Sequence, residues 1–304
     1  MRKVLLLPYW SNGRCCWRRE AENGFGPNSY HDCSSSAAWR QTRRQSGQYL
    51  EELRRTGVEP SKFFSIPNME EAHIMIDWLH TIDLGLSQDV VGNVFWYVVP
   101  KLGVANQEEN IRRLWARILA FYKENSTPSR LQSITRDMIK DGAEPPKLRS
   151  KAAECRYLVP LAAQLARENA SGVEGETIMH VTQHLNQLYE FIRMDEFPVE
   201  LASETCRRMC ILLSALEEHA MTQGSICWRM KPKAHLVQEL LEYQTTQEGN
   251  PKLFWTYRDE DWGGWLSRCA QRRGGHATPE SVSLQVLRRF MIAFKTSSGS
   301  TGAR

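Results

Sequence analysis

The chain has 304 residues, a hydrophobic fraction of 41% and a formal net charge of +4, which provides for one large or two ordinary domains. Its longest apolar stretch, 90–99, is far shorter than the roughly 18–20 residues that cross a bilayer, so we expect no membrane segment. The eight cysteines are scattered, which favours reduced thiols in the nucleus or cytoplasm over a disulfide framework. A short apolar run before Pro8 has no cleavage site after it, so we expect no secretion.

The first third of the chain has mixed signals. Residues 1–37 are rich in Ser, Asn, Gly and Cys without periodicity, which predicts an irregular segment. A helix is expected over 38–56, and short extended pieces at 63–67 and 73–76. The valine-rich run 90–99 suits a helix or a buried strand, because periodicity cannot decide so short a run.

Helical periodicity dominates the remainder. Helices are predicted over 107–125, 150–169, 175–194, 199–222, 232–244, 259–273 and 279–294. Residues 295–304, rich in Ser, Gly and Thr, are expected to form a disordered tail. The sequence therefore predicts a mainly α fold with at most a few short strands.

Two apolar seams predict a helix–helix contact. One consists of Ile178, Leu185 and Leu188, at steps of seven and three residues, and the other of Met209, Leu212 and Leu216, at steps of three and four. Such steps place side chains on one face of a helix, so we expect these two seams to pack on each other.

Charge is distributed unevenly. Residues 1–57 hold ten Lys/Arg against five Asp/Glu, a net charge of +5, and residues 265–304 hold seven against one, a net charge of +6. Residues 158–226 hold four against ten, a net charge of −6. Basic ends around an acidic middle suit a chain whose ends lie against nucleic acid, although a solvated surface with chance clustering gives the same pattern.

Three short strings contain residues that could carry chemistry. Asp77 and His80 are three residues apart, so on a helical turn they face one side and could bind a divalent metal or hold a turn together. Lys233 and His235 follow Pro232 at the start of a helix, where a basic pair also decorates many surfaces. Glu260 lies in an acidic triplet that opens a helix, where the helix dipole alone favours acids.

In this order the strings resemble the catalytic half of cut-and-paste DNA transposases of the CACTA type and their relatives, in which a helical insertion interrupts an RNase H-like fold. Asp77-Trp78-Leu79-His80 matches the Asp-x-x-His motif of the family, and Pro232-Lys233-Ala234-His235 is similar to its Pro-Lys-x-His string. Tyr257-Arg258-Asp259-Glu260 lies where the family carries its last catalytic acid.

The resemblance implies roles for particular residues. Asp77, His80 and Glu260 become the remnant catalytic residues, with Asp77 and Glu260 as metal ligands, and we expect these three to lie close together. Nucleic acid would be contacted by Lys233 and His235 together with the C-terminal arginines Arg268, Arg272, Arg273, Arg288 and Arg289.

The resemblance also implies a domain organisation. It consists of an irregular segment at 1–37, an RNase H-like remnant at 38–106, a helical insertion at 107–228, C-terminal helices with the last acidic motif at 229–294, and the tail at 295–304.

The family works by two-metal phosphoryl transfer, in which two aspartates and a glutamate hold two Mg²⁺ or Mn²⁺ ions. Here Asp32 is the only aspartate before Asp77, and it lies in a loop-like stretch. We therefore expect a truncated or decayed copy that no longer cuts DNA and binds it weakly and without sequence preference. Two alternatives stay open: an active metal-dependent transposase or nuclease, and a helical protein-interaction module with no nucleic-acid role. The sequence does not indicate an oligomeric state.

Overall fold

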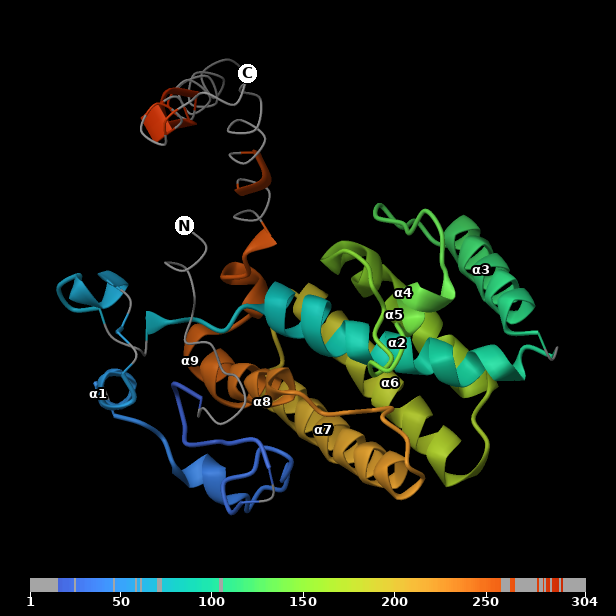
Figure 1. Cartoon of the computed structure of the whole chain (residues 1–304), viewed down its shortest axis with the longest axis horizontal. Helices are drawn as coiled ribbons and strands as arrows, with labels where there is room; N and C mark the ends of the chain where they lie inside the picture. Colours follow the sequence, from blue (N-terminus) through green and yellow to red (C-terminus); the bar gives the residue numbers. More distant parts are fainter. Residues whose placement is uncertain are drawn as a thin grey trace. The chain divides into compact units, whose positions relative to one another are not determined.

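A computed structural model describes residues 16–24, 26–45, 47–57, 59–60, 62–69, 73–103, 106–257, 263–265, 278, 281, 283–284, 286–289 and 291. Figure 1 shows that the fold is mainly helical, as predicted from the sequence. In the described part of the chain, β-structure is limited to two isolated bridges, Arg19 with Arg43 and Glu22 with Ser29. No sheet is present among the described residues of 38–106. The structure therefore does not confirm the RNase H-like remnant expected there, which stays a prediction.

The core is built on three long consecutive helices, α5 (Ala152–Glu168), α6 (Gly172–Arg193) and α7 (Val199–Thr222). The contact between α6 and α7 is the most extensive of any pair of described elements. All three residues of the first seam are buried in it, and so are Met209 and Leu216 of the second, whereas Leu212 is half-buried. The predicted packing of these two helices is confirmed.

A second group of helices packs on α5. Residues Leu79–Leu86 form a π-helical segment, η4, which continues into α2 (Ser87–Val98) and the 3-10 turn η5 (Val99–Lys101). The valine-rich run is thus a helix, buried on most of its surface against α5. Then follow α3 (Gln107–Glu124), whose first turn is capped by the Asn106 side chain, and the short α4 (Arg136–Ile139).

The N-terminal part departs from the prediction. The helix predicted over 38–56 is broken into a 3-10 turn, η1 (Ala38–Gln41), and α1 (Gln48–Arg55). Between them Arg43 pairs with Arg19 in an antiparallel bridge, and Gly47, with a positive φ of 86°, is the N-cap of α1. The extended piece expected at 63–67 is also wrong, since η2 (Lys62–Ser65) is a 3-10 turn. The described residues before 38 contain no helix, in agreement with an irregular segment.

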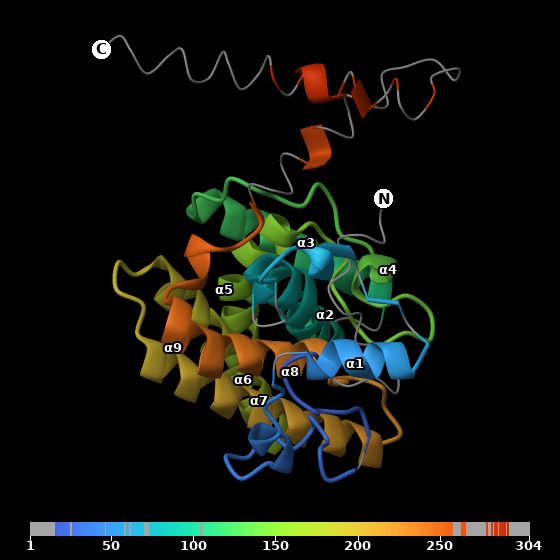
Figure 2. The same ribbon diagram turned by 90° about the vertical axis from the view of Figure 1, so that its left-hand side faces the viewer.

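One continuous helix spans residues 232–248, longer than the predicted 232–244. It consists of α8 (Pro232–Gln238), the π-helical η6 (Glu239–Gln244) and α9 (Thr245–Glu248), and the 3-10 turn η7 (Pro251–Leu253) follows it. The helix lies along α7 and also contacts η4. The described residues of 16–45, which we call the N-terminal segment, lie next to it (Figure 2). We call this helix the organising helix, because its side chains contact both the segment 76–84 and the N-terminal segment.

The chain divides into two compact units, Met1–Phe254 and Trp255–Arg304. The predicted remnant, the predicted insertion and the organising helix all belong to the first unit. In the second unit the described residues between 281 and 291 are helical, within the predicted helix 279–294. Most of the predicted helix 259–273 and the tail 295–304 lie outside the described residues. In the described regions, no helix combines the length and the apolar character that a membrane span requires.

Candidate functional site

Asp77 and His80 form a hydrogen-bonded turn at the start of η4. The Asp77 Oδ2 atom accepts from the backbone N–H of His80 at 2.9 Å and lies 2.6 Å from the Nδ1 atom of the His80 ring. The Asp77 side chain is 8% exposed and the His80 side chain 49%. One carboxylate oxygen thus caps the first turn and orients the imidazole, which leaves the ring half in solvent.

Lys233 connects the Pro-Lys-x-His string at 232–235 with the Asp-x-x-His string at 77–80. Its Nζ atom donates to the backbone carbonyl oxygens of His80 at 2.7 Å and Leu84 at 3.3 Å. A carbonyl oxygen has two lone pairs, so both atoms can accept from lysine in addition to their helical donors. Burial, aided by the charge of Lys147, lowers the pKa of Lys233 to about 8. The Asp-x-x-His and Pro-Lys-x-His strings are therefore neighbours in space.

Gly85 makes this approach possible. A methyl group added at Gly85 would lie 2.4 Å from Cδ of Lys233, closer than any carbon contact allows. A residue with a side chain at this position would displace the lysine from the carbonyl oxygens of η4.

Gln244 holds the other end of the first string. Its side-chain carbonyl accepts from the backbone N–H of Ile76 at 2.8 Å, and its side-chain amide donates to the Ile76 carbonyl at 3.2 Å. All of these atoms are buried. The organising helix thus fixes the segment 76–84 at both ends, through Gln244 and Lys233.

His235 does not reach the surface. Its side chain is fully buried and meets the Trp39 ring edge-on, with the ring centroids 4.5 Å apart. Burial lowers the pKa of His235 well below its ordinary value, so the imidazole is neutral in the folded protein. The predicted nucleic-acid contact by His235 is wrong for this fold, because packing against Trp39 removes the ring from solvent.

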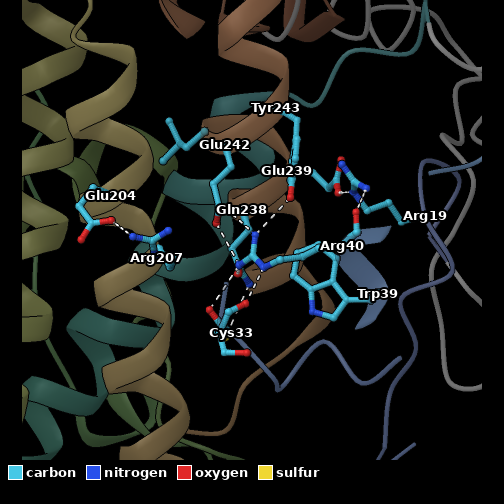
Figure 3. Close-up of polar contacts among 12 residues, drawn as sticks. Arg19, Cys33, Trp39, Arg40, Glu204, Arg207, Gln238, Glu239, Glu242 and Tyr243 are labelled. Carbon is cyan, nitrogen blue, oxygen red and sulfur yellow. Dashed lines mark hydrogen bonds and ion pairs between the residues drawn. The ribbon is translucent and has the colours of Figure 1, made fainter. Parts of the chain in front are cut away.

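A buried ionic network binds the N-terminal segment to the organising helix (Figure 3). The Arg40 guanidinium pairs with Glu242, donates to the Gln238 side chain at 2.8 Å and to the Cys33 carbonyl at 3.3 Å. Nearby, the guanidinium of Arg19 pairs with Glu239. Burial raises the pKa values of both glutamates, and the arginines oppose this shift. Sequence reasoning missed this network, because about 200 residues separate its partners.

A buried acid follows the Asp77–His80 turn. Asp83 is fully buried and accepts a hydrogen bond from the hydroxyl of Tyr189, which lies 2.7 Å from the Ser87 hydroxyl. Burial and the neighbouring charge of Asp83 raise the pKa of Tyr189 well above its ordinary value. Asp83 therefore ties η4 to α6 and is not presented to solvent.

Three thiols meet between the N-terminal segment and α7. Cys206 and Cys210, one helical turn apart on α7, lie close enough to Cys33 for the three thiols to influence one another's pKa. The hydrogen bond with Cys210 and burial raise the pKa of Cys33 far above its ordinary value. These thiols are protonated and buried, as expected for packing residues. In the described regions, no three His, Cys, Asp or Glu side chains are arranged to hold a metal ion.

The C-terminal candidates lie in the second unit. Arg288 and Arg289 are exposed on its helical residues. Glu260, Arg268, Arg272 and Arg273 lie outside the described residues, so the predicted proximity of Glu260 to Asp77 and His80 stays a prediction.

Comparison of the chain with family models, with curated proteins and with solved structures gives no match. Its function is therefore inferred from its residues and their contacts.

Proposed function

We propose that this chain is a transposase-derived protein that binds DNA weakly and without sequence preference, and that does not cut it. The observation that carries the proposal is the contact between Lys233 and His80. Two of the three strings that resemble the transposase family meet in space although 153 positions separate them. Contact between the two strings is what a shared site requires.

The proposal that the chain does not cut DNA rests on the number of carboxylates that could act as metal ligands. Hard divalent cations need about six oxygen ligands each, and two-metal catalysis needs three acids on one site. Asp32, the only aspartate upstream of Asp77, uses Oδ1 to accept from the backbone N–H of Ser34 at 3.0 Å in a loop turn. The Oδ2 atom of Asp77 is engaged by His80. These 304 residues thus offer one upstream aspartate, in a loop, where the chemistry needs two on strands.

The DNA-binding part of the proposal rests on the basic C-terminal region, with its net charge of +6 over 265–304. Arg288 and Arg289 are exposed and adjacent, and guanidinium groups are common donors to phosphate oxygens. Lys233 contributes less than the sequence indicates, because carbonyl oxygens of η4 occupy its ammonium group.

The test is the salt dependence of binding to a duplex of arbitrary sequence, measured by fluorescence anisotropy. Phosphate contacts release counterions, so the logarithm of the affinity falls linearly with the logarithm of salt concentration, by about 0.9 per contact. The variant Arg288→Gln/Arg289→Gln should bind more weakly and reduce this slope by about 2. The matched control is Arg207→Gln/Arg208→Gln, an adjacent pair on α7 in the acidic middle of the chain. Equal slopes for both variants and the parent protein would refute DNA binding through the C-terminal arginines.

A second candidate function, a helical protein-interaction module, is favoured by one observation. Leu284, Leu287 and Met291 are half or more exposed, at 56%, 56% and 50%, and their spacing places them on one helical face. Exposed apolar faces of this kind mark interaction sites. Binding that is absent, or that salt does not weaken, would favour this function over the first.

A further inference from the structure

An arginine-lined cavity opens between the N-terminal segment and the organising helix. Its volume is about 160 Å³, and Arg18, Arg19, Arg43 and Arg44 line it together with Trp17 and Tyr243. One water needs about 10–15 Å³ of such space, so the cavity is large enough for a multi-atom ligand.

The backbone forces these arginines together. Arg19 and Arg43 face each other in an antiparallel bridge, and the backbone N–H of Arg44 donates to the Arg18 carbonyl at 3.0 Å. Like charges placed across such a bridge destabilise it. Four arginines at one cavity therefore require opposite charge nearby.

Two glutamates supply only part of that charge. Glu239, in the cavity wall, pairs with Arg19 and lies 3.4 Å from the Nε atom of Arg18. Glu52 lies 2.7 Å from Arg44. Arg18 and Arg19 share Glu239, and no ion pair joins Arg43 to another described residue, so four guanidinium groups against two carboxylates leave a net charge of +2 at the cavity.

The arginines are held in place while some of their donors stay available. Arg19 also donates to the Arg40 carbonyl and stacks on the Tyr243 ring, 3.9 Å from its centroid. Arg44 uses its Nε atom to donate to the Cys16 carbonyl at 3.1 Å. Among the described residues, the Nη2 atoms of Arg19 and Arg44 have no hydrogen-bond partner, and the exposed Arg43 side chain has none at all.

We propose that this cavity binds a phosphomonoester group. Such a group carries nearly two negative charges at neutral pH, which matches the two unbalanced positive charges. Its oxygens accept paired hydrogen bonds from guanidinium forks, which are already oriented here and lose little entropy on binding. A phosphodiester in the middle of a strand has one charge and is flanked by sugars, so it fits the cavity less well.

A phosphomonoester can come from a free nucleotide or from the 5′ end of a nucleic-acid strand. The site lies in the first unit and does not include the C-terminal arginines, so it does not depend on the DNA binding proposed above.

The experiment measures binding of one short single-stranded oligonucleotide, labelled at its 3′ end, in 5′-phosphorylated and 5′-hydroxyl forms. Inorganic phosphate and adenosine monophosphate serve as competitors. The variant Arg43→Gln removes a cavity arginine without a structural partner, and Arg112→Gln on α3, 68% exposed, is its control. We expect the phosphorylated strand to bind at least about tenfold more tightly than the hydroxyl strand, and Arg43→Gln to remove most of that difference while Arg112→Gln keeps it. Circular dichroism checks that both variants fold.

Binding of adenosine monophosphate, measured directly by isothermal titration calorimetry, together with no binding of either strand form would identify a free nucleotide as the ligand and would support the cavity proposal. Equal binding of both strand forms, unchanged in Arg43→Gln and not displaced by phosphate, would overturn the cavity proposal and leave the DNA-binding proposal standing. The absence of any binding by strand, phosphate or monophosphate would overturn the cavity proposal, whereas the duplex-binding proposal is overturned by its own salt-dependence test.

Discussion

Lys233 donates a hydrogen bond from its Nζ atom to the backbone carbonyl oxygen of His80, which lies 153 positions earlier in the chain. The same amine reaches the Leu84 carbonyl, and burial lowers its pKa to about 8. The amine therefore links the start of the organising helix to the first π-helical segment, and its charge state affects how firmly the two are joined.

The pH dependence of stability should report this amine. Because the pKa of Lys233 is about 8 in the folded chain and 10.5 ordinarily, the unfolded chain binds more protons between these values, and folding is favoured as pH rises. The free energy of unfolding of the parent protein should therefore rise relative to that of Lys233→Met between about pH 8 and 10.5. Urea denaturation across this range measures the difference. Lys123→Met, at an exposed lysine of α3, is the control and should show no such trend. A constant difference for Lys233→Met would show that its pKa is not lowered.

The buried pair of Arg40 and Glu242 should be essential for stability. Their side chains are 5% and 9% exposed, and removing one partner leaves a buried charge uncompensated. Arg40→Met should lower the free energy of unfolding by about 3–5 kcal/mol. The control is Arg117→Met, whose ion pair with Glu168 is 39% and 38% exposed and should contribute less than about 1 kcal/mol.

A second substitution in the buried pair tests the cause of the loss. Adding Glu242→Gln to Arg40→Met removes the stranded charge, so urea denaturation should show partial recovery. Equal losses for Arg40→Met and Arg117→Met, or no recovery in the double variant, would contradict this role for the pair.

Gly92 should not tolerate a side chain. A methyl group there would lie 2.5 Å from the backbone N of Leu148 and 2.5 Å from Cα of Lys147, and neither backbone atom can move without disturbing α2. Gly92→Ala should lower the free energy of unfolding by about 1–3 kcal/mol or more. Gly263→Ala, where the added group meets nothing within 4 Å, should leave stability nearly unchanged. Thermal denaturation of the two variants provides the comparison, and a neutral Gly92→Ala would show that the loop at Lys147 can move away.

The helices could be predicted because their signal is local. Ile178, Leu185 and Leu188 repeat at helical steps, and the structure buries them in α6 against α7. The prediction of one helix over 38–56 failed between Gln41 and Gln48, because its arginines and glutamines do not indicate that Arg43 pairs with Arg19 in a bridge. Periodicity predicts a helix from neighbouring residues and fails where a contact that is distant in the sequence decides the local structure.

The site was harder to predict because its contacts are distant in sequence. Asp77 and His80 could be paired from their spacing, and they do form a hydrogen-bonded turn. The burial of His235 could not be predicted, because its neighbour Trp39 lies in η1, almost 200 positions earlier in the chain. The pairing of Arg40 with Glu242 could not be predicted for the same reason. The two glutamates of η6, Glu239 and Glu242, are only a weak signal of it in the sequence.

The proposal that the chain binds DNA without cutting it is tested most directly by a cleavage assay on protein that is bound to duplex DNA. Protein and duplex are mixed at a concentration at which anisotropy shows the duplex to be bound, Mg²⁺ or Mn²⁺ is added, and the products are separated on a denaturing gel. The bound DNA should stay intact with either ion, because Asp77 and Glu260 alone leave two ions short of oxygen ligands. Metal-dependent products that disappear in Glu260→Gln would contradict the proposal and show that the chain is an active nuclease.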